Sequence, residues 1–491
     1  MHTLDYPPGF AFFEYALSNN PVTTRLLRSE WLDERCLALL PDSDNEPSDR
    51  CIKFQRITVI VSDVVLFVGA YFATSAMKRL GEDRCGRAPL TTFFLVVSNP
   101  GLFLLDHIHF QYNGLMLGIL LISIGCLVRG AERGPSTVAS QRWELSGAAC
   151  YAFLLSMKHL YVILAPLYLV YLFRRHCFVT TRTDDGGMIQ LRFSASRLAC
   201  LAFVTLASFL GPFVPFLMQN DPAAQIMQIL ARLFPFGRGL VHDYWAGNVW
   251  ALYLFIGKIV SFVLRKLPLP LGAKDKLGSF IPFPVPSPRI VAVCMLIGLI
   301  PVIRQAWAVG TWSHTRRQMS NPGKFFIHGV VLSSLSGFML GYHVHEKAIM
   351  TAIVPMTLVA VNTRNTARMF IRMCMFGLFG LLPLLYRPNE LPLKTFMYIS
   401  WIFGAALALE RVHVDHIAGY RTVMQFADKI CLAFLGVVFA FMEIIHPLVF
   451  GENFEFLPLM LTSITCSVGL MWVWGEENEE LLHSSVKSAW R

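Results

Sequence analysis

A short polar stretch at residues 106–113 stands between two apolar segments of the chain. It includes His109, Gln111, Tyr112 and Asn113, whose side chains donate and accept hydrogen bonds. These groups suit the hydroxyls of a sugar, although helix caps at a membrane surface use the same residue types. Two imidazoles beside an aspartate are also metal ligands, but the flanking amides suit a sugar better. The stretch therefore predicts either a sugar-binding cluster or a set of helix caps.

A second stretch, 232–250, interleaves cations, aromatic rings and glycines. Arg238 offers the planar fork of donors that binds a phosphate group, and His242, Trp245 and Asn248 follow it. The aromatic faces suit either pyranose rings or the bilayer interface. An interfacial helix anchored by tryptophans would explain Trp245 but not the arginines and the glycine pair. The pattern thus favours a phosphate or sugar site over a simple membrane anchor.

Ionisable residues also interrupt the apolar segments at two points. His345, Glu346 and Lys347 join two such segments, and charged groups are costly beside lipid, so a functional role outranks a helix cap. Lys158 and His159 lie within the apolar piece 147–173. A lysine at the centre of a membrane span costs about 2.5 to 3.5 kcal/mol. We therefore expect the chain to break there into two short halves at the membrane surface.

The elements that carry these residues are apolar. Of the 491 residues, 55% are hydrophobic and 15% are charged, which makes the chain more apolar than a soluble domain. Runs long enough to cross a hydrocarbon core of about 30 Å recur along it, and about 11 to 13 of them predict an all-α polytopic membrane protein. Asp63, inside one run, indicates either a functional group or a hydrogen bond to a neighbouring helix. The clearest runs are 57–75, 91–105, 112–128, 198–218, 290–302, 325–340, 348–361, 369–386, 396–409, 430–450 and 456–474.

Basic residues and cysteines restrict the compartment and the chemistry. The net charge is +10, but lysines and arginines collect in short loops at 78–87, 129–142 and 174–197, as on the cytosolic side of membrane proteins. This distribution argues against nucleic acid and places the polar clusters on the opposite side. Segments between 249 and 347 do not alternate cleanly, so one of them is expected to lie in the interface. The 11 cysteines show no paired spacing, which leaves a zinc site or a disulfide framework with little support.

Four motifs resemble those of the endoplasmic-reticulum glucosyltransferases that use dolichyl phosphate glucose, and the similarity spans about residues 4–361. Residues 106–114 and 244–253 look most like the member that adds the second glucose, in α-1,3 linkage, to a lipid-linked oligosaccharide. The resemblance implies the GT-C glycosyltransferase fold, a polytopic helix bundle with its active site on the lumenal side. The motifs are Asp5-Tyr6-Pro7-Pro8, His109-Phe110-Gln111-Tyr112-Asn113, Arg232-Leu233-Phe234-Pro235-Phe236 with Arg238-Gly239, and His345-Glu346-Lys347.

The resemblance also implies a mechanism and its partners. An aspartate deprotonates the acceptor hydroxyl, which attacks the donor carbon with inversion while dolichyl phosphate leaves, and neither a metal nor a cofactor is expected. Dolichyl phosphate glucose is the donor, and a monoglucosylated dolichyl-diphosphate oligosaccharide is the acceptor, in the endoplasmic-reticulum membrane. The residues expected to bind the donor phosphate are His345, Arg238, Lys158, His159 and Lys347. Those expected to bind the acceptor sugar are His109, Gln111, Tyr112, Asn113, His242, Trp245 and Asn248.

One departure from the family concerns the catalytic base. The family carries a first membrane helix and an acidic motif upstream of the Asp-Tyr-Pro-Pro element, where this sequence begins. Asp5 is the nearest lumenal carboxylate and the candidate base, and a truncated, inactive sequence is the other expectation. Residues 1–56 are then expected as a lumenal loop remnant, 57–361 as the core bundle and 362–491 as C-terminal membrane helices. A noncatalytic relative and a lipid or sugar transporter remain alternatives, although the sequence shows no internal repeat typical of transporters.

Overall fold

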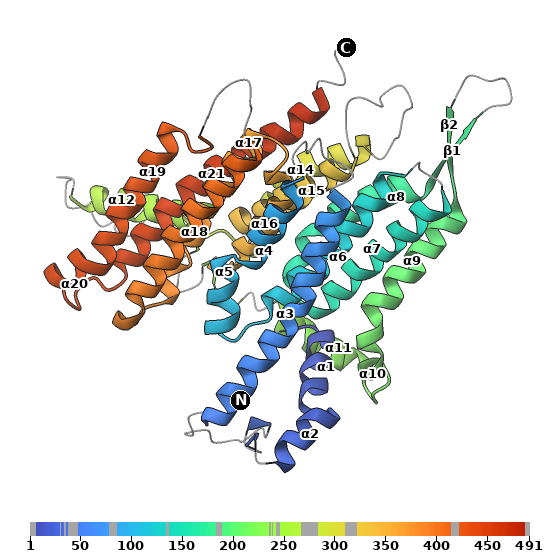
Figure 1. Cartoon of the computed structure of the whole chain (residues 1–491), viewed down its shortest axis with the longest axis horizontal. Helices are drawn as coiled ribbons and strands as arrows, with labels where there is room; N and C mark the ends of the chain where they lie inside the picture. Colours follow the sequence, from blue (N-terminus) through green and yellow to red (C-terminus); the bar gives the residue numbers. More distant parts are fainter. Residues whose placement is uncertain are drawn as a thin grey trace, which may run out of the picture. The chain divides into compact units, whose positions relative to one another are not determined.

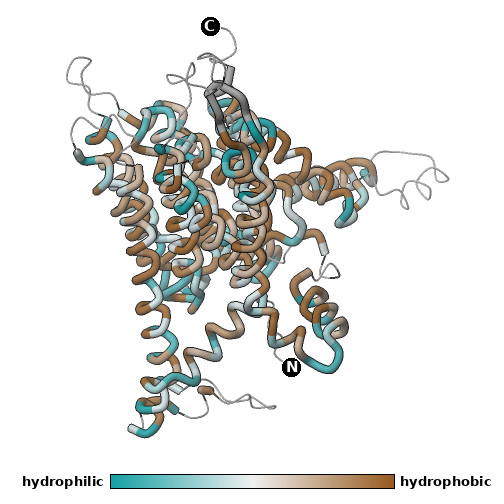
Figure 2. The backbone as a smooth tube through the Cα atoms, turned by 90° about the vertical axis from the view of Figure 1, so that its right-hand side faces the viewer, coloured by the Kyte–Doolittle hydropathy of each residue, from teal (hydrophilic) through white to brown (hydrophobic). Residues whose placement is uncertain are grey.

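The structure, a computed structural model, is helical over most of the residues it describes (Figure 1). Among these residues, 10 helices are long and apolar enough to cross a membrane. In Figure 2 the long helices are brown over much of their length, with teal mainly at their ends and in the turns. The predicted class, an all-α polytopic membrane protein, is confirmed. The described residues are 6–29, 31–33, 36–37, 48–77, 86–133, 137–182, 189–234, 237, 239–241, 246–266, 283–309, 322–413 and 422–486.

The clearest apolar runs of the sequence match these long helices, with one exception. The run 348–361 forms the shorter helix α16 (Met350–Ala360), whose residues are all buried. A second apolar helix of limited length, Val249–Leu264, forms most of α12. These two segments account for the difference between the long helices of the described chain and the roughly 11 to 13 spans predicted.

Contacts between Cα atoms divide the chain into two units, Met1–Pro235 with Ala306–Ile327 and Phe236–Gln305 with His328–Arg491. Two helices, α14 (Pro288–Val309) and α15 (Pro322–Leu340), contribute residues to both units. The other elements of the first unit are α1 (Pro8–Ser18), α2 (Pro21–Arg28), α3 (Asp49–Met77), α4 (Ala88–Val97), α5 (Pro100–Leu102), η2 (Phe103–Ile108), α6 (Asn113–Ala131), α7 (Val138–Met157), η3 (His159–Leu164), α8 (Ala165–His176), β1 (Phe178–Arg182), β2 (Ile189–Phe193), α9 (Ala195–Leu210), η4 (Gly211–Phe213), α10 (Val214–Leu217) and α11 (Pro222–Leu233). Those of the second unit are α12 (Val249–Lys266), η7 (Glu346–Ile349), α16 (Met350–Ala360), α17 (Arg364–Phe379), η8 (Leu382–Leu384), η9 (Pro388–Glu390), α18 (Leu391–Val412), α19 (Phe426–Ala440), η10 (Phe441–Ile445), α20 (His446–Val449) and α21 (Leu457–Val486).

Two helices, α1 and α2, lie within residues 1–56, where a lumenal loop was expected. The Asn20 side chain caps α2 by accepting a hydrogen bond of 2.9 Å from the backbone N–H of Thr23. Helix α1 lies close against α7, because a Cβ at Gly9 would collide with Ser156. Both helices are too short to stand out in a hydropathy pattern, so the sequence alone did not predict them.

A disulfide joins Cys36 to Cys51 across a sequence separation of 15 residues. It links the segment after α2 to the first turn of α3. The expectation that disulfides have little support is therefore wrong for this pair. A separation of 15 residues matches no recognisable cysteine motif, so the sequence did not indicate the pair. Cys126 and Cys374 are buried free thiols, as expected of small packing residues.

Close backbone packing holds the helices of the first unit together. Helices α3 and α6 approach so closely that a Cβ at Gly69 would collide with the carbonyl oxygen of Gly118, and membrane helices often pack through such small residues. The predicted break near Lys158 is confirmed. Helix α7 ends at Met157, Lys158 is extended (φ −150°, ψ 115°), and the tighter helix η3 begins at His159.

Candidate active site

Asp106 organises the polar stretch that leads into α6. Its side chain is almost fully buried, with an exposed fraction of 1%. Its Oδ1 accepts hydrogen bonds from the backbone N–H and the side-chain amide of Asn113, at 3.0 and 2.8 Å. Its Oδ2 accepts a bond of 2.5 Å from the backbone N–H of Gly114. A carboxylate at this position satisfies the unpaired N–H groups of the helix start and complements the helix dipole.

Lys158 joins this network from the break after α7. Its Nζ donates a hydrogen bond of 2.8 Å to Asn113 Oδ1, and the Asn113 amide also donates a bond of 3.0 Å to Gln111 Oε1. The lysine is largely buried, with an exposed fraction of 9%. Two clusters predicted from distant parts of the sequence therefore meet. The network places a cation next to amide groups, a combination that suits a sugar phosphate.

Tyr112 connects the same stretch to α3 and α1. Its hydroxyl lies 2.9 Å from Thr58 Oγ1, and its ring packs edge-on against Phe13, with the ring centroids 5.1 Å apart. Burial raises the pKa of Tyr112 to about 12, and the nearby charge of Glu14 adds to the shift. The hydroxyl therefore keeps its proton at physiological pH. Burial also raises the pKa of Glu14 above its ordinary value.

No role was predicted from the sequence for Tyr6, which belongs to the Asp-Tyr-Pro-Pro motif, or for Glu14. The Tyr6 ring centroid lies 5.9 Å from Lys158 Nζ, within reach of a cation–π interaction. The negative charge of Glu14 acts on Tyr112, whose pKa it raises. Because Asp5 is bonded to Tyr6, the motif that contains Asp5 reaches the Lys158 cluster, although Asp5 itself lies outside the described residues.

Asp63 and three histidines complete the surroundings of this cluster. Asp63 on α3 pairs with His107 on η2, with Oδ2 and Nε2 2.9 Å apart, which favours the second of the two interpretations of this residue, a bond to a neighbouring helix. His159 packs edge-on against Phe234, with ring centroids 5.7 Å apart. His109 ends the π-helical turn η2.

In the second unit, the stretch around residue 239 joins the His-Glu-Lys motif. The His343 backbone N–H donates a bond of 2.8 Å to the Leu240 carbonyl, and His343 Nδ1 lies 3.0 Å from the Gly239 carbonyl oxygen. Val241 and Val344 add a parallel β-bridge. Gly239 has φ +92°, a conformation that favours glycine. The residues that flank Arg238 and His345 are thus tied together, although Arg238, His242 and Trp245 lie outside the described residues.

Asn248 has a capping role in this unit. It is 2% exposed, and its Oδ1 accepts bonds from the backbone N–H groups of Trp250 and Ala251 at the start of α12, at 3.1 and 3.2 Å. Its carbonyl oxygen accepts a bond of 2.6 Å from Ser467 on α21. The predicted contact of Asn248 with a sugar stays a prediction.

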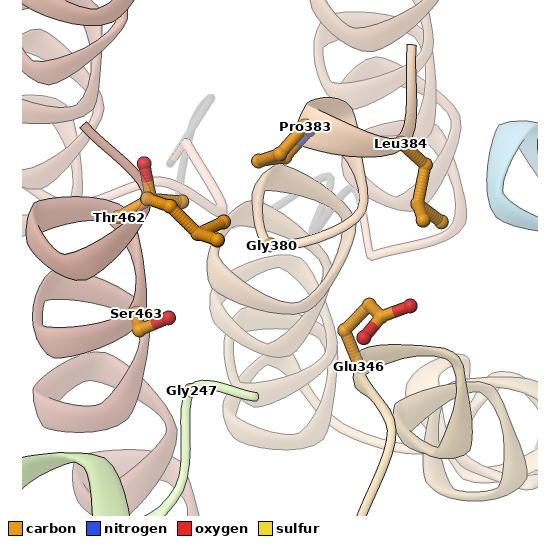
Figure 3. A pocket seen from close by; sticks show the side chains of 8 residues that line it. Gly247, Glu346, Gly380, Pro383, Leu384, Thr462 and Ser463 are labelled. Atoms are coloured by element: carbon orange, nitrogen blue, oxygen red, sulfur yellow. The ribbon is translucent and has the colours of Figure 1, made fainter. Parts of the chain in front are cut away.

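Glu346 points into a small cavity beside the motif (Figure 3). The cavity of about 10 Å³ is lined by Gly247, Thr462 and Ser463 among others, and has room for one water molecule. Glu346 Oε2 is buried and has no hydrogen-bond partner in the described part of the chain. Burial raises the pKa of the Glu346 carboxyl, and its own backbone N–H and the charge of Lys347 oppose the shift.

The predicted site residues that the structure describes fall into two groups. The first unit brings Lys158, Asn113 and Gln111 into one hydrogen-bonded network, with Tyr112 beside it. The second unit holds the His-Glu-Lys motif at the start of η7, tied to the Gly239–Leu240 backbone through His343. The donor and acceptor roles of the individual residues stay predictions.

These features define a class of protein before any comparison: a multi-pass membrane protein whose helix ends carry buried polar clusters. The chain belongs to the ALG6, ALG8 glycosyltransferase family, which it matches over residues 1–476. It is therefore a glycosyltransferase, and the family resemblance noted in the sequence is confirmed.

Individual relatives agree with the family assignment. A mouse protein named dolichyl pyrophosphate Glc1Man9GlcNAc2 alpha-1,3-glucosyltransferase is 32% identical over 99% of this chain and 87% of its own length. The Arabidopsis thaliana protein of the same name is 33% identical over 96% of this chain and 87% of its own length. A Drosophila melanogaster protein, named as a probable enzyme of this kind, is 31% identical over 96% of this chain and 83% of its own length.

Proposed function

We propose that this protein transfers glucose from dolichyl phosphate glucose to a monoglucosylated, mannose-rich oligosaccharide on dolichyl diphosphate, in α-1,3 linkage. This step belongs to the assembly of the precursor for asparagine-linked glycans. The observation that carries the proposal is the similarity of the chain to proteins named for this acceptor. The similarity extends over 96–99% of the length of the chain. The buried Lys158–Asn113–Asp106 network supports it, because it combines the cation and the amide groups that a sugar phosphate needs.

The negative charge of the departing phosphate is the main charge that the site must stabilise during the reaction. Negative charge grows on the leaving dolichyl phosphate in the transition state, so fixed cations and donors near it lower the barrier. Lys158 supplies such a cation in the first unit, and His345, Lys347 and Arg238 are the groups proposed for the same task in the second unit. The link between His343 and the Gly239–Leu240 backbone supports a common role for Arg238 and His345.

The acceptor hydroxyl needs a base and oriented hydrogen-bond partners. Tyr112, Gln111 and Asn113 are proposed to orient the acceptor, with His109 beside them. Asp5 is the proposed base, because the neighbouring Tyr6 ring lies at Lys158. Glu14 is the competing carboxylate, since it lies near Tyr112. Loss of transfer in Asp5→Asn but not in Glu14→Gln would assign the base to Asp5, and the reverse result would assign it to Glu14.

The site is proposed to face the lumen of the endoplasmic reticulum. Disulfides persist in oxidising compartments, so the Cys36–Cys51 pair favours a lumenal position for the segment that follows α2. The basic loops of the sequence favour the cytosol for the opposite ends of the helices. Both indications agree on the side that carries the Lys158 cluster, because α1 precedes the disulfide and lies against α7.

Glucosyl transfer in membranes tests the proposed function. The chain would be expressed in cells that lack their own enzyme for this step. Microsomes prepared from these cells would receive dolichyl phosphate glucose labelled in the sugar. We expect the monoglucosylated lipid-linked oligosaccharide to gain one hexose, and the unglucosylated oligosaccharide or uridine diphosphate glucose to support no transfer. Lys158→Met should abolish most of the product, whereas Lys53→Met, at an exposed position of α3, should not. Binding of the acceptor without turnover would instead favour a noncatalytic relative.

A further inference from the structure

A wide apolar groove lies between α18 and α19, in a part of the second unit to which no role in the reaction is assigned. Its volume is about 480 Å³, within the range of roughly 300 to 1,000 Å³ that is typical of small-molecule sites. Lys429 is the one charged side chain among the described residues that line it. The apolar lining includes Ile399, Ile402 and Phe403 from α18 and Leu432, Gly436 and Phe439 from α19.

Two ion pairs hold the helices around this groove in place. Lys394 Nζ lies 2.5 Å from Glu443 Oε1, and the pair joins the start of α18 to the turn η10 that follows α19. Arg372 Nε lies 2.6 Å from Asp428 Oδ1, which fixes the start of α19 to α17. Lys394, Arg372 and Asp428 are buried. Separating a buried ion pair is costly, so these pairs fix the positions of the helices beside the groove. The groove thus lies between helices whose starts are fixed by buried ion pairs.

The surroundings of the groove restrict what can occupy it. Helices α18 and α19 belong to the apolar spans Pro388–Val412 and Phe426–Val449. Their outer faces expose large apolar side chains such as Phe396, Leu407 and Phe434, as expected for contact with lipid. An apolar cavity stays dry, so water is a poor occupant. A flexible hydrocarbon chain from the bilayer matches both the lining and the medium.

Lys429 distinguishes a charged lipid from a neutral one. It lies in the first turn of α19, at the start of the span, where basic side chains reach the level of lipid headgroups. The neighbouring Asp428 forms an ion pair with Arg372. Because Arg372 offsets the negative charge of Asp428, that charge repels an anion at Lys429 only weakly. An ammonium in this position attracts a lipid phosphate.

We propose that the groove between α18 and α19 binds one acyl chain of an anionic phospholipid, whose phosphate group contacts the Lys429 ammonium. The lipid fills the space between two membrane-spanning helices that do not pack directly along this seam. It is a bound component of the fold and is separate from the donor and acceptor. The proposal does not depend on glucosyl transfer, since it concerns lipid binding alone.

Two glycines offer a matched pair of variants. Gly436 lines the groove, whereas Gly404 on α18 is exposed and is not part of the lining. A Cβ at either position meets no atom within 4 Å, so a side chain at either position starts in open space. Leucine also favours a helix more than glycine does, so both variants should fold. Gly436→Leu therefore fills the groove, and Gly404→Leu is its control. Lys429→Gln removes the charge and keeps the groove.

Native mass spectrometry of the purified full-length protein would measure retention of dioleoylphosphatidylglycerol and dioleoylphosphatidylcholine supplied in equal amounts. We expect the wild type and Gly404→Leu to retain the anionic lipid preferentially. Gly436→Leu should weaken its binding by about tenfold, as expected when about two methylene groups lose their burial. Lys429→Gln should bind both lipids equally. Equal binding by Gly436→Leu and the wild type, or an unchanged preference in Lys429→Gln, would overturn the proposal.

A second test locates the bound acyl chain of the lipid directly. Phosphatidylglycerol with a photoactivatable group on one acyl chain should label peptides that cover 395–403 and 429–439 in the wild type. Gly436→Leu should remove that labelling, and Gly404→Leu should not. Dolichyl phosphate serves as a competitor. If it displaced phosphatidylglycerol at a lower concentration than phosphatidylglycerol itself, the groove would bind an isoprenoid substrate tail and the phospholipid assignment would be wrong.

Discussion

Lys158 Nζ donates a hydrogen bond to Asn113 Oδ1 across 2.8 Å, although the two residues lie 45 positions apart in the chain. The contact joins the break after α7 to the first turn of α6. Asn113 also donates to Asp106 at 2.8 Å, so the ammonium and the carboxylate interact through a single amide. A cation held in this way is positioned by the fold before any ligand binds, and preorganised charge is what a phosphate leaving group requires.

Lys158→Met should impair both activity and stability. Methionine keeps most of the length of the side chain but leaves the buried Asn113 Oδ1 without its donor, which costs about 1 to 3 kcal/mol. Loss of one stabilising donor also typically lowers kcat by about 10²- to 10³-fold. Glucosyl transfer and thermal unfolding in detergent would measure the two effects. Lys53→Met at the exposed site on α3 is the control and should match the wild type.

A double-mutant cycle with Asn113→Ala tests whether the two residues act together. Because they are in direct contact, the two changes should be coupled by about 0.5 to 3 kcal/mol in the free energy of unfolding. Additive effects within experimental error would mean that the contact contributes nothing beyond the separate residues.

Gly114→Ala should disturb the turn that Asp106 caps. A Cβ at this position would lie 2.9 Å from Asp63 Oδ1 and 3.2 Å from Asp106 Oδ2, closer than ordinary contacts allow. We expect a loss of about 1 to 3 kcal/mol, as for other overpacked sites. The matched control is Gly404→Ala, where nothing lies within 4 Å and alanine should be neutral or slightly stabilising. Thermal unfolding of both variants decides the matter, and equal melting temperatures would contradict the close contact.

Loss of the Cys36–Cys51 disulfide should destabilise the N-terminal part of the first unit. A loop of about 15 residues closed by a disulfide contributes about 3 kcal/mol in the chain-entropy account. Cys36→Ser should therefore lower the melting temperature, and in the denatured protein it should leave the buried Cys51 reactive towards a maleimide reagent without prior reduction. Cys200→Ser removes an exposed free thiol and should leave the melting temperature unchanged. A wild-type protein whose Cys51 reacts before reduction would refute the disulfide in the native state.

Hydropathy and polar interruptions predicted much of this architecture from the sequence. Long apolar runs such as 57–75 and 430–450 became spanning helices, because length and apolarity alone decide whether a helix can cross a bilayer. The break at Lys158 was predictable for a related reason, since a buried mid-span ammonium is costly. The meeting of Lys158 with Asn113 followed from placing both on one side of the membrane, although no local pattern specified which atoms touch.

Features that depend on distant packing were not predictable. Helices α1 and α2 are short, and their position depends on contacts such as that of Gly9 with Ser156. The cavity at Glu346 is lined in part by Thr462 and Ser463 of α21, more than a hundred residues further along the chain, so no motif around Glu346 indicates it. The cap that the Asn248 side-chain oxygen forms on α12 was not predicted, and the contact of Asn248 with a sugar stays a prediction. Amides suit both tasks, and only the fold shows which partner lies within reach.

The buried Glu346 carboxyl should make stability depend on pH in a defined direction. Burial raises its pKa in the folded protein, so the folded state binds this proton more tightly than the unfolded chain. The contribution to stability is full below the pKa of the unfolded state and is lost as the pH rises through the raised folded pKa. Glu346→Gln does not titrate and avoids this loss. Its melting temperature relative to the wild type should therefore increase from about pH 4 towards pH 7.

Thermal unfolding of the purified protein over this pH range provides the measurement for Glu346→Gln. Glu452→Gln, at an exposed position, is the control and should show no such trend. A difference between Glu346→Gln and the wild type that stays constant with pH would show that the carboxyl does not change its protonation on folding.

The last prediction concerns Arg238 and His345, which flank the backbone link formed by His343. His343 binds the Gly239 and Leu240 carbonyls. A substitution in one motif should therefore alter the position of the other motif. Arg238→Lys keeps the charge but removes the fork of donors, and it should lower glucosyl transfer by about 10²-fold while the melting temperature changes little. His345→Ala should have a similar effect. If both residues bind the same donor phosphate, the double variant should lose much less than the product of the two single losses, because residues that act as a unit are not additive. Transfer assays at saturating and limiting dolichyl phosphate glucose would separate kcat from KM. Fully multiplicative losses, or wild-type transfer by Arg238→Lys, would show that the two motifs do not share the phosphate.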